Sequence, residues 1–134
     1  MAPPVIVLGV GRSGTTLLRV MLDLSSELAI PYETFFVPQL AHRHGSRPNI
    51  AKFLDDLGRL RTLYDWGIKP DDVRPRLEEG MATREAIAAI FETYAERQGK
   101  PRWGRTNNCS CSRRAPRPTP APATSRRRNA RPKS

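Results

Sequence analysis

Hydrophobic residues near the start of the chain form a continuous run, and those further along recur at helical spacing. Val5–Leu8 follows two prolines and is rich in β-branched residues, which is typical of a buried strand in a parallel sheet. A glycine-rich turn over residues 9–14 comes next, and the pattern then predicts a helix over 15–24. The apolar face predicted for this helix comprises Leu17, Leu18, Met21 and Leu22.

The rest of the apolar pattern predicts one short strand and then helices. Leu28–Ile30 can form the strand, which Pro31 ends. Helices are predicted, in order, over residues 35–42, 50–63, 70–77 and 83–98. A strand, a turn and a helix followed by further helices favour the α/β class. One clear strand makes no sheet, so we expect residues 1–104 to be the N-terminal part of a larger domain.

The helix over 83–98 has the clearest signature. Thr83 is its predicted N-cap, and Gly99 is predicted to end it. Its apolar residues fall at i, i+3, i+4 and i+7 and are Ile87, Ile90, Phe91 and Tyr94.

Charge is distributed unevenly along the 134 residues. The chain carries 23 Lys and Arg against 13 Asp and Glu, a formal net charge of +10. Residues 105–134 hold nine of the basic residues, five prolines, no acidic residue and no large apolar side chain. We expect this segment to be a disordered Arg/Pro/Ala-rich tail, because it cannot bury a core.

A basic-tailed nucleic-acid-binding protein is an alternative interpretation. Arg113-Arg114 and Arg126–Arg128 would neutralise phosphates in a salt-sensitive way. The tail has no aromatic side chain on which bases could stack, so no specific nucleic-acid partner is predicted.

Composition also bears on location and on metal sites. The longest apolar run, Val5–Val10, is far shorter than the ~20 residues of a membrane-spanning helix. The first residues lack the charged segment of a secretory signal. Cys109 and Cys111 are the only cysteines and have no histidine nearby, so neither a disulfide framework nor a zinc site is predicted. We expect a cytoplasmic protein with no metal cofactor.

The chemistry of the chain is concentrated between the first strand and the first helix. Glycines allow a tight turn there, and amides at a helix start point toward negative charge, so this loop is suited to hold an anion. Arg12 adds a permanently charged planar group, and three hydroxyls add hydrogen bonds. The loop reads Gly9-Val10-Gly11-Arg12-Ser13-Gly14-Thr15-Thr16.

Two nucleotide-binding patterns fit this loop in part. A triphosphate-binding loop needs lysine where the chain has Thr15, so an ATPase or GTPase is disfavoured. The dinucleotide pattern G-x-G-x-x-G fits at Gly9, Gly11 and Gly14. Its ribose-binding acid is expected about 20 residues further on, where the chain has Glu33. That acid should directly follow the second strand, however, and here Pro31 and Tyr32 intervene. A Rossmann-type dinucleotide-binding fragment therefore stays open as an alternative.

The loop and the residues after it resemble the sulfotransferases that use 3′-phosphoadenosine 5′-phosphosulfate (PAPS). The resemblance covers residues 4–40, which read PVIVLGVGRSGTTLLRVMLDLSSELAIPYETFFVPQL. It is greatest for the Arg-Ser-Gly-Thr-Thr branch, which includes bacterial members and tyrosylprotein sulfotransferases. In that branch a Glu-Thr pair follows the first helix, as Glu33-Thr34 does here, whereas Ser25-Ser26 replaces a frequent His-Pro pair.

The resemblance implies a P-loop NTPase-like α/β fold and transfer of a sulfuryl group from PAPS to a hydroxyl of a small molecule, carbohydrate or peptide. Arg12 would stabilise charge on the leaving phosphate, and Glu33 would be the general base that takes the proton of the acceptor. The residues implied to bind PAPS are Gly11, Arg12, Ser13, Gly14, Thr15 and Thr16.

The second half of the family's cofactor site, an Arg and a Ser that bind the 3′-phosphate, has no counterpart in residues 41–104. Lys100–Gly104 resembles a segment that these proteins continue with Asp-Lys, a pair that a shifted reading frame can encode across Arg105–Asn107. We therefore hypothesise that residues 105–134 are an out-of-frame translation. We expect no measurable turnover from the chain as given.

The remaining polar and aromatic residues have structural interpretations. Arg19 and Asp23 are one turn apart and are predicted to form an exposed helix pair. His42 and His44 are predicted to be surface residues. Trp66 lies in a short aromatic segment that is predicted to anchor a loop.

Overall fold

A parallel sheet of three strands lies at the centre of the computed structural model, which describes residues 3–10, 13–32 and 34–109. The strands are β1 (Val5–Val10), β2 (Leu28–Ala29) and β3 (Arg102–Cys109). Their order is β1-β3-β2, so the last strand in the sequence is the central one. Together with the helices, this sheet confirms the α/β class.

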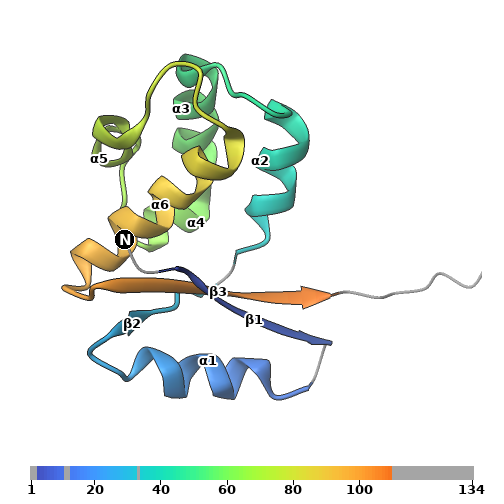
Figure 1. The fold of residues 1–134 in the computed structure, drawn as a ribbon, viewed down its shortest axis with the longest axis vertical. Coiled ribbons are helices and arrows are strands. Elements are labelled where there is room, and N and C mark those ends of the chain that lie inside the picture. The colour runs from blue at the N-terminus through green and yellow to red at the C-terminus, as the bar shows by residue number, and fades with distance from the viewer. Residues whose placement is uncertain (1–2, 11–12, 33, 110–134) are drawn as a thin grey trace, which may run out of the picture.

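Helices lie on both sides of the sheet (Figure 1). The helix α1 (Thr15–Asp23) lies against one face. A helical layer lies on the other side and comprises α2 (Phe36–His44), α3 (Ile50–Arg59), α4 (Arg61–Asp65), α5 (Pro70–Val73), the 3-10 turn η1 (Arg74–Arg76) and α6 (Thr83–Arg97).

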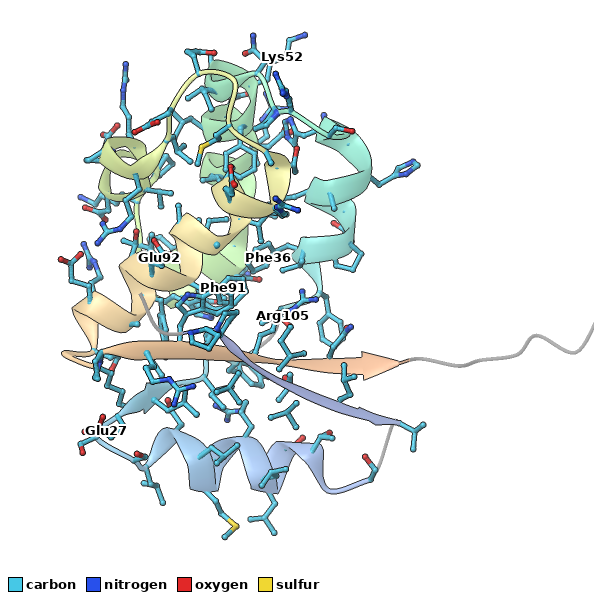
Figure 2. All side chains as sticks on the ribbon, in the orientation of Figure 1. Glu27, Phe36, Lys52, Phe91, Glu92 and Arg105 are labelled. Atoms are coloured by element: carbon cyan, nitrogen blue, oxygen red, sulfur yellow. The ribbon has the colours of Figure 1, made fainter. Side chains whose placement is uncertain are left out.

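The hydrophobic core fills the helical layer and reaches the sheet through aromatic rings. The apolar face predicted for α6 is confirmed, since Ile90 and Phe91 are fully buried. The ring of Phe91 stacks on that of Trp103 in β3, with centroids 4.8 Å apart, and lies 6.2 Å from that of Phe36. Figure 2 shows Phe36 and Phe91 directly above β3. These contacts hold the helical layer against the central strand.

Trp66 belongs to the same aromatic group, as its predicted anchoring role requires. Its ring packs edge-on against Phe36, at 5.5 Å between centroids, and lies 5.2 Å from the ring of Tyr94. Tyr64, two residues earlier, is 83% exposed and takes no part in this packing.

Two predicted helices are divided. Leu60 has extended backbone angles, φ −81° and ψ 109°, so the helix predicted over 50–63 forms α3 and α4 with a break between them. The helix predicted over 70–77 ends as an α-helix at Val73 and continues as η1. Pro75 explains this second end, because proline has no amide hydrogen with which to extend α5.

The start of α6 also differs from the prediction. Ala82, and not Thr83, is the N-cap. The amide of Ala82 donates to Oε2 of Glu85 at 3.0 Å, so a side chain within the first turn binds back to the N-cap residue. Thr83 is the first helical residue, and its hydroxyl is buried without a hydrogen-bond partner among the described residues.

The prediction for the buried side of α1 is wrong. Leu17 and Met21 of the predicted apolar face are exposed, with 66% and 60% of their surface accessible. Thr15 is buried instead, and Arg19 and Asp23 are half-buried. Arg19 and Asp23 turn toward the sheet because they bind the backbone groups of Ile30, directly after β2.

The predicted boundary after Gly104 falls inside β3. Residues 105–109 continue the strand and stay in register with β1 as far as Val10. A strand ladder forms through backbone groups, which explains why a segment of tail-like composition takes part in it. Burial lowers the pKa of the Arg105 guanidinium within this strand. Residues 110–134 of the predicted tail lie outside the described residues.

No helix in the described part of the chain is both long and apolar enough to cross a lipid bilayer.

Candidate functional site

The loop after β1 lies at the edge of the sheet where the parallel strands β1 and β3 end. Ligands of open parallel sheets bind at this edge. The amide of Ser13 donates to the carbonyl of Val10 at 3.2 Å, so the chain turns back on the strand end before α1 begins. Gly11 and Arg12 of the predicted anion site lie outside the described residues.

Two glycines make the tight course of this loop possible. A Cβ atom placed on Gly9 would overlap Cγ2 of Thr15 and lie 2.8 Å from Oγ of Ser13, so a side chain would clash where the loop meets the helix. Gly14 has a φ of +82°, in the left-handed region that other residues rarely adopt. The glycine-rich turn predicted here is therefore confirmed at both positions.

The start of α1 has the electrostatics of an anion site. Gly14 is the N-cap and offers no side chain to the first amides of the helix, which have no acceptor within it. No acidic residue lies in the first turn, so no carboxylate of α1 competes with an incoming anion. Thr15 is buried and Thr16 is exposed, and both add a hydroxyl group. This helix start can hold a phosphate or sulfate group.

A pocket of 530 Å³ opens beside the start of α1. Its volume lies within the range of small-molecule sites, ~300–1,000 Å³. Three segments of the chain meet there: the first half of α1, the residues after β2 (32 and 34–39) and the second half of β3. The lining residues are Thr15, Thr16, Arg19, Tyr32, Thr34, Phe35, Pro38, Gln39, Thr106 and Asn107.

Glu33, the predicted general base, lies outside the described residues. Its neighbours Tyr32 and Thr34 both line the pocket, as do Thr15 and Thr16 of the predicted anion site. The two segments that the sequence nominated separately therefore border one pocket.

Among the pocket residues that the sequence analysis did not assign to the site, two come from a distant part of the sequence. Thr106 and Asn107 lie on β3, within the segment predicted to be a disordered tail. The hydroxyl of Thr34 donates to the carbonyl of Thr106 at 2.8 Å, which ties the two pocket walls together. The only available signal was indirect: a parallel partner of β1 must end at the same edge of the sheet as the loop.

Arg19 and Asp23 do not form the exposed pair predicted for them. Asp23 Oδ1 accepts from the amide of Ile30 at 2.9 Å, and Arg19 NH1 donates to the carbonyl of Ile30 at 3.2 Å. Ile30 is completely buried, so its backbone groups need partners within the protein. Asp23 also pairs with Lys100, whose Nζ lies 3.1 Å from Oδ1.

The two histidines differ from one another. His42 is exposed, as predicted. The prediction for His44 is wrong, because its side chain is only 6% exposed and its Nε2 lies 2.9 Å from Oδ2 of Asp56. Asp56 lies two turns into α3, which brings a partner to His44 that no local sequence pattern indicates. This pair lies outside the pocket.

No group of three or more His, Cys, Asp or Glu side chains within the described ranges is arranged to hold a metal ion.

Comparison with known families agrees with the geometry of the loop. A model of the sulfotransferase family matches residues 3–125, which is most of the chain. The chain belongs to the sulfotransferase family. No curated protein and no solved structure matches it. The family match includes β1, α1, β3 and the loop over residues 11–14, which is called the anion loop, so every segment that lines the pocket lies within the sulfotransferase match.

Proposed function

We propose that this sulfotransferase takes its sulfuryl group from PAPS and that the loop between β1 and α1 holds the 5′-phosphosulfate end of that donor. The observation that carries the proposal is the close approach of the Gly9 backbone to Thr15 at the start of α1, next to the pocket. PAPS would supply an activated sulfuryl group for transfer to a hydroxyl.

The chain's own residues fit this donor. The first amides of α1 and the hydroxyls of Ser13, Thr15 and Thr16 supply hydrogen bonds to oxyanions. Glycine at position 9 keeps open the space that a Cβ would fill. Pocket walls that carry hydroxyl and aromatic groups leave room for an acceptor beside the anion loop.

Two residues receive chemical roles by their positions in the family pattern. Arg12 stabilises the negative charge that builds up on the leaving phosphate, because a guanidinium binds such oxygens through two donors. Glu33 accepts the proton of the acceptor hydroxyl as the new bond to sulfur forms. The acceptor is a small molecule, a carbohydrate or a peptide.

Binding of adenosine 3′,5′-bisphosphate, the desulfated product of PAPS, tests the proposal without requiring turnover. Isothermal titration calorimetry of the chain should show saturable binding, and Arg12→Ala should weaken it by roughly tenfold to a hundredfold, since a charge-assisted hydrogen bond is lost. Arg59→Ala is the matched control, because Arg59 forms an exposed pair with Asp55 on α3. Its affinity should equal that of the native chain.

The same titrations separate the proposal from a dinucleotide site. NADH should bind more weakly than the bisphosphate. Tight NADH binding with no response to the bisphosphate would instead support the Rossmann-type alternative.

Glu33→Gln distinguishes a base from a ribose ligand. The amide keeps the shape of the side chain but accepts no proton, so affinity for the bisphosphate should stay within about twofold. In a chain whose downstream half is restored, kcat for sulfuryl transfer should fall by ~10²–10⁴-fold. Loss of nucleotide affinity would show that Glu33 contacts the nucleotide and would contradict its role as base.

A further inference from the structure

Four side-chain hydrogen bonds hold the segment that leads from β2 into the pocket wall. Two of them bind Ile30, one binds the carbonyl of Tyr32, and one leaves from Thr34. Their partners outside the segment lie on α1, at Trp66 after α4, and on β3. The residues on either side of position 33 are therefore fixed from three elements.

The contribution of α1 is the most specific of these. Arg19 and Asp23 lie one turn apart and grip the carbonyl and the amide of the same residue, Ile30. Both side chains lie on α1, the helix whose first turn forms the proposed anion site. One helix therefore contacts both the anion loop and the residues that follow β2.

Further contacts fix the two gripping side chains. The guanidinium of Arg19 lies 5.6 Å from the ring centroid of Tyr32, within cation–π distance. Asp23 is held by Lys100, which is only 15% exposed and lies just before β3. Neither side chain is free to swing away in the described part of the molecule.

Tyr32 is held from the helical layer as well. The indole Nε1 of Trp66 donates to its carbonyl at 2.9 Å. Trp66 packs in turn against Phe36 and Tyr94. Residues 30–32, which follow β2, are thus held by α1 on one side of the sheet and by the aromatic core on the other.

We propose that Arg19 and Asp23 are positioning residues of the sulfuryl-transfer site, which through their two bonds to Ile30 set the place of residues 30–32 and 34 relative to the first turn of α1. This inference rests on the proposed function, in which Glu33 is the general base that takes the proton of the acceptor hydroxyl. A nucleotide bound at the first turn of α1 restricts the motion of the helix. Through Arg19 and Asp23, the helix in turn restricts the backbone of Ile30 and Tyr32.

Hydrogen–deuterium exchange, measured with and without adenosine 3′,5′-bisphosphate, tests this role. In the native chain the nucleotide should slow exchange in peptides that cover residues 28–35. Arg19→Met keeps the stem but removes the donor, so exchange there should rise about fivefold or more and no longer respond to the nucleotide. The affinity for the nucleotide should stay within about threefold, because Arg19 acts on the segment and not on the ligand.

Three further variants make the result specific. Arg19→Lys restores a charged donor and should recover most of the nucleotide response. Asp23→Asn keeps the oxygen that accepts from Ile30, so exchange in residues 28–35 and its response to the nucleotide should stay like those of the native chain. Faster exchange in this variant would show that the charge pair with Lys100, and not the bond to Ile30, holds the segment. Arg59→Met, an exposed arginine on α3, controls for loss of a guanidinium elsewhere and should change nothing in residues 28–35.

The outcomes separate the two proposals. Native-like exchange in Arg19→Met, with the native chain binding the nucleotide, would overturn the positioning role and leave the proposed function standing. A tenfold or greater loss of nucleotide affinity in Arg19→Met would make Arg19 a ligand and also overturn it. Failure of the native chain to bind the nucleotide would overturn the proposed function and the positioning role that depends on it.

Discussion

The imidazole Nε2 of His44 lies 2.9 Å from Oδ2 of Asp56, and both side chains are almost completely buried. Arg43 adds a second contact, since its Nε lies 3.2 Å from the same oxygen. The ring of Phe53 closes the other side, packed edge-on against the imidazole at 5.2 Å. The end of α2 and the middle of α3 are thus joined through one carboxylate.

Asp56→Ala should lower the free energy of unfolding by about 1–3 kcal/mol, because it leaves a buried imidazole without its partner. Urea denaturation followed by circular dichroism measures this change. Asp55→Ala is the matched control: Asp55 pairs with Arg59 at the surface of the same helix, where the loss should stay below about 0.5 kcal/mol. Equal effects of the two substitutions would show that burial of the His44 pair adds nothing.

Tyr94 should make the fold sensitive to alkaline pH. Burial raises the pKa of its phenol above the ordinary value of 10.0, with a further contribution from the negative charge of Asp23. The unfolded chain then loses this proton at a lower pH than the folded chain. The contribution of Tyr94 to the free energy of unfolding is therefore complete below pH 10 and declines as the pH rises further. Tyr94→Phe should reduce that decline.

Thermal unfolding at several pH values between 8 and about 11 measures the effect of Tyr94. Tyr64→Phe is the control, because Tyr64 is 83% exposed. The decline should persist in Tyr64→Phe, and an equally steep decline in Tyr94→Phe would contradict the assignment.

Gly14→Ala should separate the strain of a backbone turn from its role in binding. Alanine at a φ of +82° should lower the free energy of unfolding by about 1–2 kcal/mol. Gly80→Ala provides a close match, since Gly80 has a φ of +84° and, like Gly14, has open space where a Cβ would be. Both variants should lose similar stability, but only Gly14→Ala should weaken binding of adenosine 3′,5′-bisphosphate. Equal nucleotide affinity in the two variants would remove Gly14 from the binding site.

Arg105→Met should raise the urea midpoint of unfolding. Residue 105 lies on the same side of β3 as Trp103, toward the helical layer, and burial there lowers the pKa of its guanidinium. Methionine keeps an apolar stem without a charge that must be dehydrated. Arg61→Met, on an exposed position of α4, should leave the midpoint unchanged. A lower midpoint for Arg105→Met would mean that the charge itself stabilises the strand.

Local sequence patterns predicted those features of the fold that depend on neighbouring residues alone. The spacing of Ile90 and Phe91 predicts the buried side of α6 because that side repeats every turn. The glycines at 9 and 14 predict the loop because their backbone angles and close contacts follow from the turn itself. The break at Leu60, by contrast, is marked by no proline, and the nearby Gly58 lies within α3 and not at the C-cap where a glycine usually ends a helix.

The rest of the site depends on distant partners. Arg19 and Asp23 turn inward because Ile30, after the following strand, has backbone groups to satisfy. Thr106 enters the pocket wall because β3 pairs with β1, a contact that no local pattern announces. Composition alone pointed the other way for Thr106, since the residues after it are basic and rich in proline.

The central position of β3 has a consequence for the order of events during synthesis. Val5 and Gly104, which face one another across β1 and β3, are separated by roughly a hundred residues, so closing this contact carries a high entropic cost. At about 5–20 residues per second, a ribosome needs several seconds to make the chain between them. Throughout that time both β1 and β2 are without the strand that they flank, while the helices from α2 to α6 can already pack on one another. The anion loop therefore acquires its sheet edge only at the last stage, when the final strand inserts between two that were made long before it.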